Sequence, residues 1–428
     1  MKRMNIGIFG RVNSGKSTLM NLITQQYLSI VDSTPGTTTD VKTTVMEIHD
    51  FGPIKLFDTA GIDENGKLGL KKKKKAFDTL KRSDIVLLVI NESNNAYNFG
   101  DYNSEKEIIE LAQKRKKELF IVVNKFENTR NKKLFNFEVL SEYKCKKIDI
   151  NLSKKENYMV LVEFLIKNSK VKFKDTELLP PLEKDRVVFL NIPMDEETPN
   201  GRFLRPQMMI EEYLVRKYIP TFAYRMDLIK ARSQVIEIQE AERLRFMNFI
   251  KYLKRDNKLQ LLITDSQAMD VIAKWTKYLD IEITTFSIVM INFLSNGELK
   301  LFVDGIKAFE NLKRGDKIMI AEGCNHDRKA EDIGTIQIPN KINEIFGNGS
   351  IEIDHYFGRV FADYEKLKEY KLIIHCGGCM LDNQVIKSRI EDLVDSRVSF
   401  TNFGVLLSYF QGKKELNRVI KPYGLKIC

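Results

Sequence analysis

A glycine-rich segment near the amino terminus limits the folds open to this chain more than any other part of its sequence. The segment, GRVNSGKS at residues 10–17, fits G-x-x-x-x-G-K-[ST] and lies between an apolar run and a helical pattern. That is the strand–loop–helix context of a P-loop, whose backbone N–H groups and helix N-terminus surround a phosphate. We expect Lys16 to reach the β- and γ-phosphate oxygens and Ser17 to bind Mg²⁺. The other expected cradle residues are Gly10, Asn13, Ser14, Gly15 and Thr18.

A second phosphate-binding element, DTAG at residues 58–61, ends the apolar run 54–57. A carboxylate at the end of a strand faces the Mg²⁺ shell, and Gly61 leaves its N–H free for the γ-phosphate. Between the two elements, a loop opened by Pro35 and Gly36 carries Thr38, our choice for a hydroxyl that binds Mg²⁺ only while the γ-phosphate is present. The expected catalytic residues are Lys16, Ser17, Thr38, Asp58 and Gly61.

A third motif, NKFE at residues 124–127, resembles the guanine-reading N-K-x-D of GTPases, in which the acid accepts hydrogen bonds from N1 and N2 of the base. Asn124 and Lys125 match that motif. Glu127 is one methylene longer than aspartate, but its carboxylate still accepts both bonds if the backbone retreats. The sequence therefore favours GTP over ATP.

The position after Gly61 is Ile62, where many GTPases carry a glutamine that orients the attacking water. We therefore expect slow intrinsic hydrolysis or another device. Asn13 offers a neutral oxygen suited to a monovalent cation, and the P-loop together with the threonine loop resembles that of K⁺-activated GTPases. Equal rates in Na⁺ and K⁺ would exclude this hypothesis.

Strand-like runs alternate with helical stretches over residues 1–170, which predicts a doubly wound α/β domain. A charged, proline-bearing stretch up to residue 186 has the composition of a linker. We expect a small α/β domain at residues 185–260 and a further α/β domain at residues 261–428. No repeat at a fixed period is evident. The strand-like runs of the last domain are 261–263, 283–293, 318–321, 372–374 and 398–400.

Three thiols and two imidazoles gather after two of these runs: Cys324 and His326, then His375, Cys376 and Cys379. The carboxyl ends of parallel strands line one crevice. Thiolates select an Fe–S cluster or Zn²⁺, and neighbouring glycines let backbone N–H groups bond the sulfurs. Zinc would close its site with a histidine, whereas a four-iron cluster would keep a replaceable fourth ligand. The residues alone leave both open.

A P-loop GTPase segment followed by C-x-H and then H-C-x-x-C resembles the HydF family of [FeFe]-hydrogenase maturation GTPases. Segments such as TTFS at 284–287 and TNFG at 401–404 also resemble that family, and the resemblance covers nearly the whole chain. It implies a GTPase domain, a dimerisation domain and an iron–sulfur cluster-binding domain, in that order. It also implies a homodimeric scaffold that carries a [4Fe–4S] cluster, works with two radical-SAM maturases and passes a two-iron precursor to apo-[FeFe]-hydrogenase.

The motif match implies that Cys324, Cys376 and Cys379 hold the cluster, with His326 or His375 near the open fourth iron position. Two residues depart from the family pattern. Glu127 stands where aspartate is usual, and Asp327 follows His326 where a second histidine is common. The C-x-H core remains intact.

Two other functions fit part of the sequence. A K⁺-activated ribosome-assembly or tRNA-modifying GTPase with a structural zinc site would use the P-loop, the threonine loop, the net charge of +11 and the basic run from Lys67 to Arg82. Apart from the structural zinc, this function gives the clustered thiols no role, and no GXXG nucleic-acid clamp is seen in the last two domains. A zinc-stabilised regulatory GTPase is the second, and the identity of the bound metal would distinguish it. We expect no nucleic-acid partner.

The amino terminus lacks the apolar core of a signal peptide, and the apolar runs are shorter than a membrane-spanning helix requires. Five cysteines, an odd count, argue against a disulfide framework. We therefore expect a cytoplasmic chain with no membrane partner.

Overall fold

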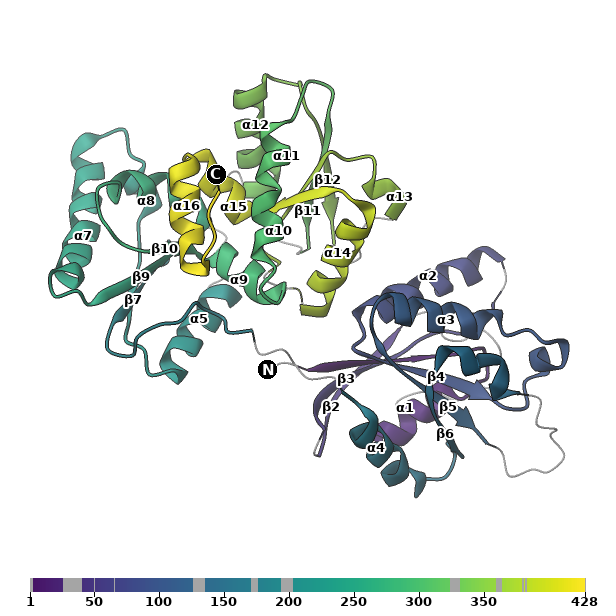
Figure 1. Cartoon of the computed structure of the whole chain (residues 1–428). Coiled ribbons are helices and arrows are strands. Elements are labelled where there is room, and N and C mark those ends of the chain that lie inside the picture. Colours follow the sequence, from purple (N-terminus) through teal and green to yellow (C-terminus); the bar gives the residue numbers. More distant parts are fainter. Residues whose placement is uncertain are drawn as a thin grey trace. The chain divides into compact units, whose positions relative to one another are not determined.

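The computed structural model of the chain forms two compact units, Met1–Phe173 and Lys174–Cys428 (Figure 1). Each unit is described by itself. The described residues are 3–25, 41–49, 51–64, 66–125, 135–170, 176–193, 203–323, 332–358, 364–378, 381 and 383–427. None of the helices within these residues is long and apolar enough to cross a membrane.

The amino-terminal unit is built on a six-stranded sheet of order β2-β3-β1-β4-β5-β6, in which only β2 runs antiparallel. The central strand β1 is buried at every residue. A strand of this kind needs cover on both faces of its sheet. The strands are β1 (Met4–Phe9), β2 (Lys42–Ile48), β3 (Gly52–Asp58), β4 (Ile85–Asn91), β5 (Glu118–Asn124) and β6 (Lys146–Ile150).

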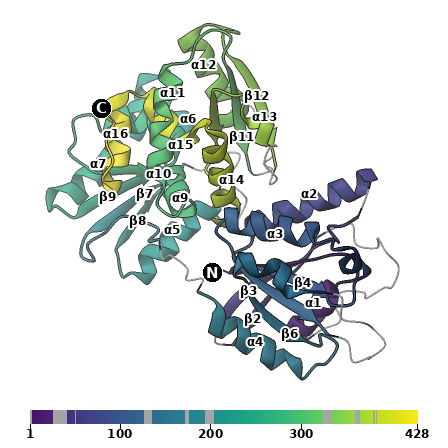
Figure 2. The same ribbon diagram turned by 45° about the vertical axis from the view of Figure 1, so that its right-hand side comes forward.

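Helices supply this cover. α1 (Lys16–Thr24) and α4 (Asn157–Asn168) pack on one face of the sheet, and α2 (Gly66–Arg82) and α3 (Asn103–Lys114) pack on the other (Figures 1 and 2). The doubly wound α/β fold expected for the first domain is confirmed. The expected phosphate-binding residues follow β1 and β3, at the carboxyl ends of neighbouring parallel strands.

The carboxyl-terminal unit contains two four-stranded sheets, of order β10-β9-β7-β8 and β12-β11-β13-β14, and all their strand pairs are parallel. The strands are β7 (Val187–Asn191), β8 (Thr221–Tyr224), β9 (Leu259–Thr264), β10 (Ile283–Thr285), β11 (Lys317–Glu322), β12 (Glu352–Phe357), β13 (Leu372–His375) and β14 (Ser399–Asn402). The longer helices are α5 (Arg205–Arg216), α7 (Ile236–Arg255), α8 (Met269–Trp275), α9 (Phe286–Leu294), α12 (Ile338–Phe346), α14 (Asn383–Ser396), α15 (Phe403–Phe410) and α16 (Lys413–Ile420).

Two features of this unit differ from expectation. β9 and β10 pair into the sheet of β7, so the strand pairing runs across the boundary expected at residue 260, and we propose that the middle domain extends to Leu294. The apolar run 283–293, expected as one strand, has only three strand residues before α9 begins. Thr285 caps that helix, because its hydroxyl accepts a hydrogen bond from the N–H of Ile288 at 3.2 Å. A buried apolar run does not by itself separate strand from helix.

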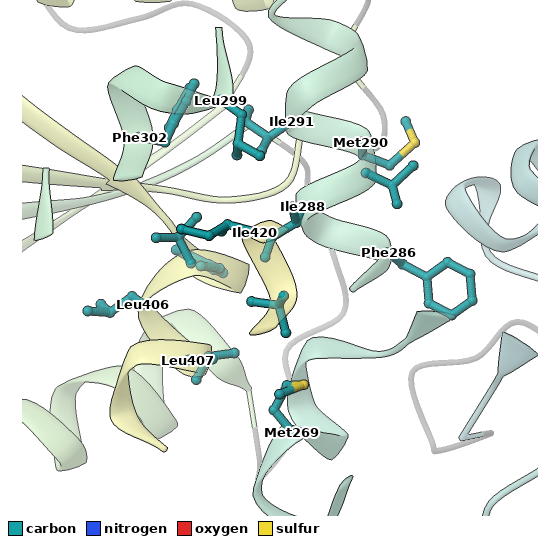
Figure 3. Packing of buried hydrophobic residues seen from close by; sticks show 14 of the residues in the cluster. Met269, Phe286, Ile288, Met290, Ile291, Leu299, Phe302, Leu406, Leu407 and Ile420 are labelled. Carbon is teal, nitrogen blue, oxygen red and sulfur yellow. The ribbon is translucent and has the colours of Figure 1, made fainter. Parts of the chain in front are cut away.

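One hydrophobic cluster joins the two sheets of this unit. Helix α9 presents Ile288 and Ile291 to the same cluster as Leu406 of α15 and Ile420 of α16 (Figure 3). Leu299 and Phe302, from the short helix α10 (Leu299–Asp304), lie in it as well. The two sheets therefore fold around a shared core.

Candidate nucleotide site and cysteine edge

The P-loop leaves β1 in a backbone conformation that requires glycine at two positions. Gly10 has φ 148° and Gly15 has φ 104°. A Cβ at Gly10 would lie 2.3 Å from the Val89 carbonyl oxygen, and one at Gly15 would lie 2.5 Å from Asn124 Nδ2. Side chains are therefore excluded at both positions, and the loop lies against the ends of β4 and β5.

Lys16 is buried at the first turn of α1, and its ammonium group donates to the carbonyls of Gly10 at 3.1 Å and Arg11 at 2.7 Å. Burial lowers the pKa of Lys16 to about 8, against the opposing effect of Asp58, Asp63 and Glu64. The P-loop thus holds its cation close to the loop backbone, where phosphate oxygens would approach.

Ser17 and Asp58, two of the residues expected at the Mg²⁺ site, contact each other. The Ser17 hydroxyl donates to Asp58 Oδ2 at 2.9 Å, and the Asp58 side chain is 1% exposed. The next residue, Thr59, donates its hydroxyl to the Ile8 carbonyl at 2.7 Å, which fixes the DTAG segment to β1. Ile62 is buried in the core beneath α2 and α3, so no polar side chain at this position orients water.

A direct link joins the P-loop to the segment after DTAG. The backbone N–H of Val12 donates to Asp63 Oδ1 at 2.7 Å. The following residue, Glu64, accepts from the buried ammonium group of Lys72 in α2 at 2.6 Å. P-loop N–H groups are also the donors that phosphate oxygens use, so Asp63 holds a donor of the phosphate site.

Arg11 fastens the same loop to helix α3. Its guanidinium pairs in bidentate fashion with Glu105, at 2.9 Å and 3.1 Å, and Arg11 is only 5% exposed. Tyr97 donates its hydroxyl to the same carboxylate at 3.0 Å. The buried pair makes α3 a support for the P-loop.

Asn124 connects the P-loop to the loop after β6. Its amide donates to the Ser14 carbonyl at 3.3 Å and accepts from the N–H of Leu152 at 3.2 Å. Lys125 follows with an exposed side chain. Asn124 of the expected base-reading segment thus contacts the P-loop, while Glu127 lies outside the described residues.

The cysteine edge forms where β11 and β13 end side by side. Ala321 pairs with His375, and the N–H of Gly323 donates to Cys376 Sγ at 3.2 Å. The Cys376 side chain is buried, and Gly378 follows with φ 64°. A backbone N–H directed at a buried sulfur stabilises a thiolate, so the donor set fits a metal or cluster held by sulfur.

His375 is fixed by both of its ring nitrogens. Arg389 of α14 donates to Nε2 at 2.8 Å, and Nδ1 lies 2.6 Å from the Cys376 carbonyl. An arginine can only donate, so Nε2 accepts and Nδ1 carries the proton. His375 would bind a metal only if Arg389 released Nε2.

Several predicted site residues fall outside the described residues: Thr38, Glu127, Cys324, His326 and Cys379. Within the described part, no group of three or more His, Cys, Asp and Glu side chains converges on a point that could hold a metal ion. Asn13, the expected K⁺ ligand, is exposed and has φ 57°. Thr18 lies in the first turn of α1, next to Ser17.

Comparison with known families matches most of the chain. A model of the hydrogen maturase F dimerisation domain matches residues 178–294, and a model of the hydrogen maturase F tetramerisation domain matches residues 300–422. The chain belongs to the hydrogen maturase F (HydF) family. A 50S ribosome-binding GTPase model matches residues 5–125, which confirms the P-loop GTPase domain. In this family the domain with the cysteine edge is the one described as a tetramerisation domain.

The curated relatives named here match about a third of the chain. A GTPase Der of Kosmotoga olearia is 36% identical over 127 residues, 28% of this chain and 27% of that protein. A tRNA modification GTPase MnmE of Desulforamulus reducens is 32% identical over 160 residues, 35% of this chain and 32% of that protein. The chain thus spans about a third or less of their length. A crystal structure of Era from Aquifex aeolicus with GDP and AlF₄⁻ is 25% identical over 40% of this chain and 58% of that one, at a TM-score of 0.35.

Sequence reasoning missed four residues that shape these sites in this HydF-family chain. Arg11 sits at a variable position of the P-loop motif, and Asp63 lies beyond the DTAG segment. Arg389 and Asn402 reach the cysteine edge from α14 and from the end of β14. Only Asn402 had a local signal, since polar residues that end a parallel strand gather at its ligand-binding edge.

Proposed function

We propose that this chain is a GTP-hydrolysing scaffold that binds a [4Fe–4S] cluster and delivers a two-iron precursor to apo-[FeFe]-hydrogenase. The observation that carries the proposal is the junction of Gly323 and Cys376, which brings two strand ends with clustered cysteines together in a chain that also has a P-loop GTPase domain. Membership of the hydrogen maturase F family supports it.

In this proposal residues 10–18 would hold the phosphates of GTP, and Ser17 and Asp58, which contact each other, would hold Mg²⁺. Lys16 neutralises phosphate charge, and Gly61 donates its N–H to the γ-phosphate. Thr38 would be a further Mg²⁺ ligand, and Asn124, Lys125 and Glu127 would read the guanine. K⁺ bound at Asn13 would add positive charge beside the phosphates, which would partly replace the water-orienting glutamine whose position the buried Ile62 occupies.

We assign the cluster to Cys324, Cys376 and Cys379. An open iron position on such a cluster supplies a point where a bridging ligand from a second iron unit can attach. The contacts of His375 with Arg389 favour His326 as the histidine nearest that position. The backbone N–H of Gly323 would hold the Cys376 thiolate when the cluster is bound.

The partners in this proposal are radical-SAM maturases, apo-[FeFe]-hydrogenase and a second copy of the chain in the cytoplasm. The dimerisation domain at residues 178–294 supports a homodimer, and the tetramerisation domain at residues 300–422 supports further assembly. GTP hydrolysis would act as a switch in partner affinity, because a loop gated by phosphate shifts an equilibrium only through contacts that differ between states.

Metal and acid-labile sulfide analysis, with EPR after dithionite reduction, tests the proposal on anaerobically reconstituted wild type and Cys376→Ala. We expect about four irons per chain and a reduced-cluster signal that the variant loses. One tightly bound zinc and no EPR signal would contradict it and would favour a ribosome-assembly, tRNA-modifying or regulatory GTPase with a structural metal site. Activation of apo-hydrogenase by the loaded protein tests the delivery step, and GTPase rates in K⁺ and Na⁺ test the cation.

A further inference from the structure

The two sheets of the carboxyl-terminal unit share one topology. When the strands of each sheet are numbered in chain order, both sheets read 2-1-3-4 and every pair is parallel. In each sheet a helix begins directly after the fourth strand, α9 after β10 and α15 after β14. The sequence shows no fixed-period repeat, yet the folded unit contains two copies of one arrangement.

The strand register aligns the two copies residue by residue. One row of paired residues crosses each sheet at its carboxyl edge: Tyr224, Asn191, Thr264 and Thr285 in the middle domain, and Tyr356, Ala321, His375 and Asn402 in the last domain. The fourth member of each row caps the next helix, because Thr285 accepts from Ile288 N–H and Asn402 accepts from Gly404 N–H. Thr285 and Asn402 are therefore equivalent.

The equivalent residues contact each other in a reciprocal pattern. The hydroxyl of Ser287, two residues after Thr285, donates to Asn402 Oδ1 at 3.1 Å and would lie 3.1 Å from a Cβ at Gly377. Gly404, two residues after Asn402, is the residue equivalent to Ser287 in the other copy. A Cβ there would lie 3.0 Å from Thr285 Oγ1, 3.1 Å from Ser266 Oγ and 2.9 Å from the Ser287 side chain.

This pattern is that of an internal two-fold relation, in which residue i of one copy meets j of the other and j meets i. The following helices obey it too, since α10 packs on β14 and α16 packs on β10. Phe302 of α10 and Phe400 of β14 meet edge to face with ring centroids 5.0 Å apart. In chain order α10 follows the first sheet's strands and α16 follows the second sheet's strands, so the helix after each copy covers the last strand of the other.

The carboxyl edges of the two sheets differ in one respect, since only the edge of the last domain carries cysteine. Asn402 also donates its side-chain N–H to the carbonyl of His375 at 3.3 Å. Thr285 makes no such bond to the carbonyl of Thr264 within the described residues, because its hydroxyl is a shorter group and serves there as the acceptor from Ile288. His375 directly precedes Cys376. A hydrogen-bonded path thus runs from Ser287 of the middle domain through Asn402 to the backbone that carries the thiol.

We propose that Ser287 and Asn402 are positioning residues that hold the His375–Cys376–Gly377 turn. The middle domain would then orient the Cys376 thiol through the seam, by which we mean the contacts of Ser287 and Thr285 with Asn402 and Gly404. The middle-domain edge at Thr264, Ser266 and Thr285 is the counterpart without a thiol. It therefore supplies a matched control for each substitution at the cysteine edge.

The test exchanges the two capping residues across the seam. Asn402→Thr keeps a capping oxygen but replaces the amide that reaches the His375 carbonyl with a shorter hydroxyl, and Thr285→Asn makes the reverse change at the edge without a thiol. Because Cys376 is buried, a reagent reaches it only when the turn opens. In the full-length metal-free chain, we expect Cys376 to be alkylated by iodoacetamide about fivefold faster in Asn402→Thr than in wild type. Thr285→Asn should match wild type. Peptide mass mapping separates Cys376 from the other cysteines.

Equal rates in Asn402→Thr and wild type, or the same increase in Thr285→Asn, would overturn the proposal. If Asn402→Thr does not fold, Ser287→Ala is the second variant, and it should raise the rate in the same direction by a smaller factor. The EPR line shape of the reconstituted cluster is a further readout. Of the measurements named here, only this one depends on the proposed function. It should change in Asn402→Thr and not in Thr285→Asn. If Asn402→Thr is alkylated faster than wild type but wild type binds no cluster, the proposed function is wrong and this inference still holds.

Discussion

The two candidate sites of this chain are supported in different ways. At the nucleotide site the motif residues bond to one another: Lys16 bonds to carbonyls of its own loop, Ser17 to Asp58 on a neighbouring strand and Asn124 to Ser14, while Arg11 adds a tie to α3. The cysteine edge is held from outside, by Arg389 on α14 and by Asn402, which Ser287 of the other sheet contacts in turn. A motif can specify the first kind of site almost completely, whereas the second depends on how distant segments pack.

The largest expected effect is a loss of GTP hydrolysis that leaves the cysteine edge unchanged. Lys16→Ala should lower kcat for GTP hydrolysis about 100-fold or more, because it removes the cation nearest the phosphates. Measured without nucleotide, the rate of Cys376 alkylation should stay at the wild-type value. A steady-state GTPase assay and the alkylation assay check this, and a changed alkylation rate would break the comparison.

The second prediction removes external support from the cysteine edge. Arg389→Met should lower the free energy of unfolding of the carboxyl-terminal unit by about 3 kcal/mol, because buried acceptors on His375 and Gly358 lose a charged donor. Urea unfolding followed by Trp275 fluorescence reports on this unit, since Trp275 is the only tryptophan of the chain.

Its control is Arg216→Met in the same unit, where the arginine side chain is 76% exposed and pairs with Glu212 on the surface of α5. A surface pair of this kind contributes little, so we expect a change within about 0.5 kcal/mol. Equal losses in both variants would mean that Arg389 gives the cysteine edge no special support.

The contrast also explains what the sequence could predict. The strand before the P-loop and the pairing of Ser17 with Asp58 were predictable, because each residue type and spacing follows from phosphate and Mg²⁺ chemistry. Arg389 and Asn402 were not predicted as supports, because their role depends on α14 and β14 packing beside β13. No spacing along the chain encodes such contacts.

Two strands of the carboxyl-terminal unit, β12 and β10, were missed or misjudged because they lack a clear apolar strand pattern. β12 (Glu352–Phe357) is an edge strand with mostly polar or half-exposed residues, so it lacks the apolar run that marks the buried strands. β10 is only three residues long and merges with the apolar helix α9. The internal repeat escaped notice because the two copies share little more than a strand, a capping residue and a phenylalanine at Phe286 and Phe403.

The third prediction concerns the link between the two phosphate elements. Asp63→Ala should tighten binding of a non-hydrolysable GTP analogue about fivefold and leave GDP binding nearly unchanged, because Asp63 accepts from the Val12 N–H that a γ-phosphate oxygen would take. Calorimetric titration measures both affinities. Glu64→Gln is the control for the loss of a nearby negative charge, since Glu64 also acts on Lys16 but accepts from Lys72 and not from the Val12 N–H. If Asp63→Ala weakens both nucleotides equally, Asp63 supports the site and does not compete for it.

The smallest expected effect follows from the burial of Lys16, which lowers its pKa to about 8 in the nucleotide-free chain. Bound phosphates raise that pKa, so binding takes up a proton wherever the free amine is already deprotonated. At pH 7 the amine is charged before binding and uptake is small. At pH 8 about half a proton should be taken up, and GDP affinity should fall by less than tenfold per pH unit above that.

Calorimetry in two buffers with different ionisation enthalpies measures this uptake. Lys16→Arg should show none from this side chain, because a guanidinium keeps its proton. Asn402→Thr should show the wild-type value, because the pKa of Lys16 is set by burial and by Asp58, Asp63 and Glu64, all within the amino-terminal unit. A changed uptake in Asn402→Thr would mean that the cysteine edge acts on the nucleotide site even without a bound metal, and that the two sites are not supported separately.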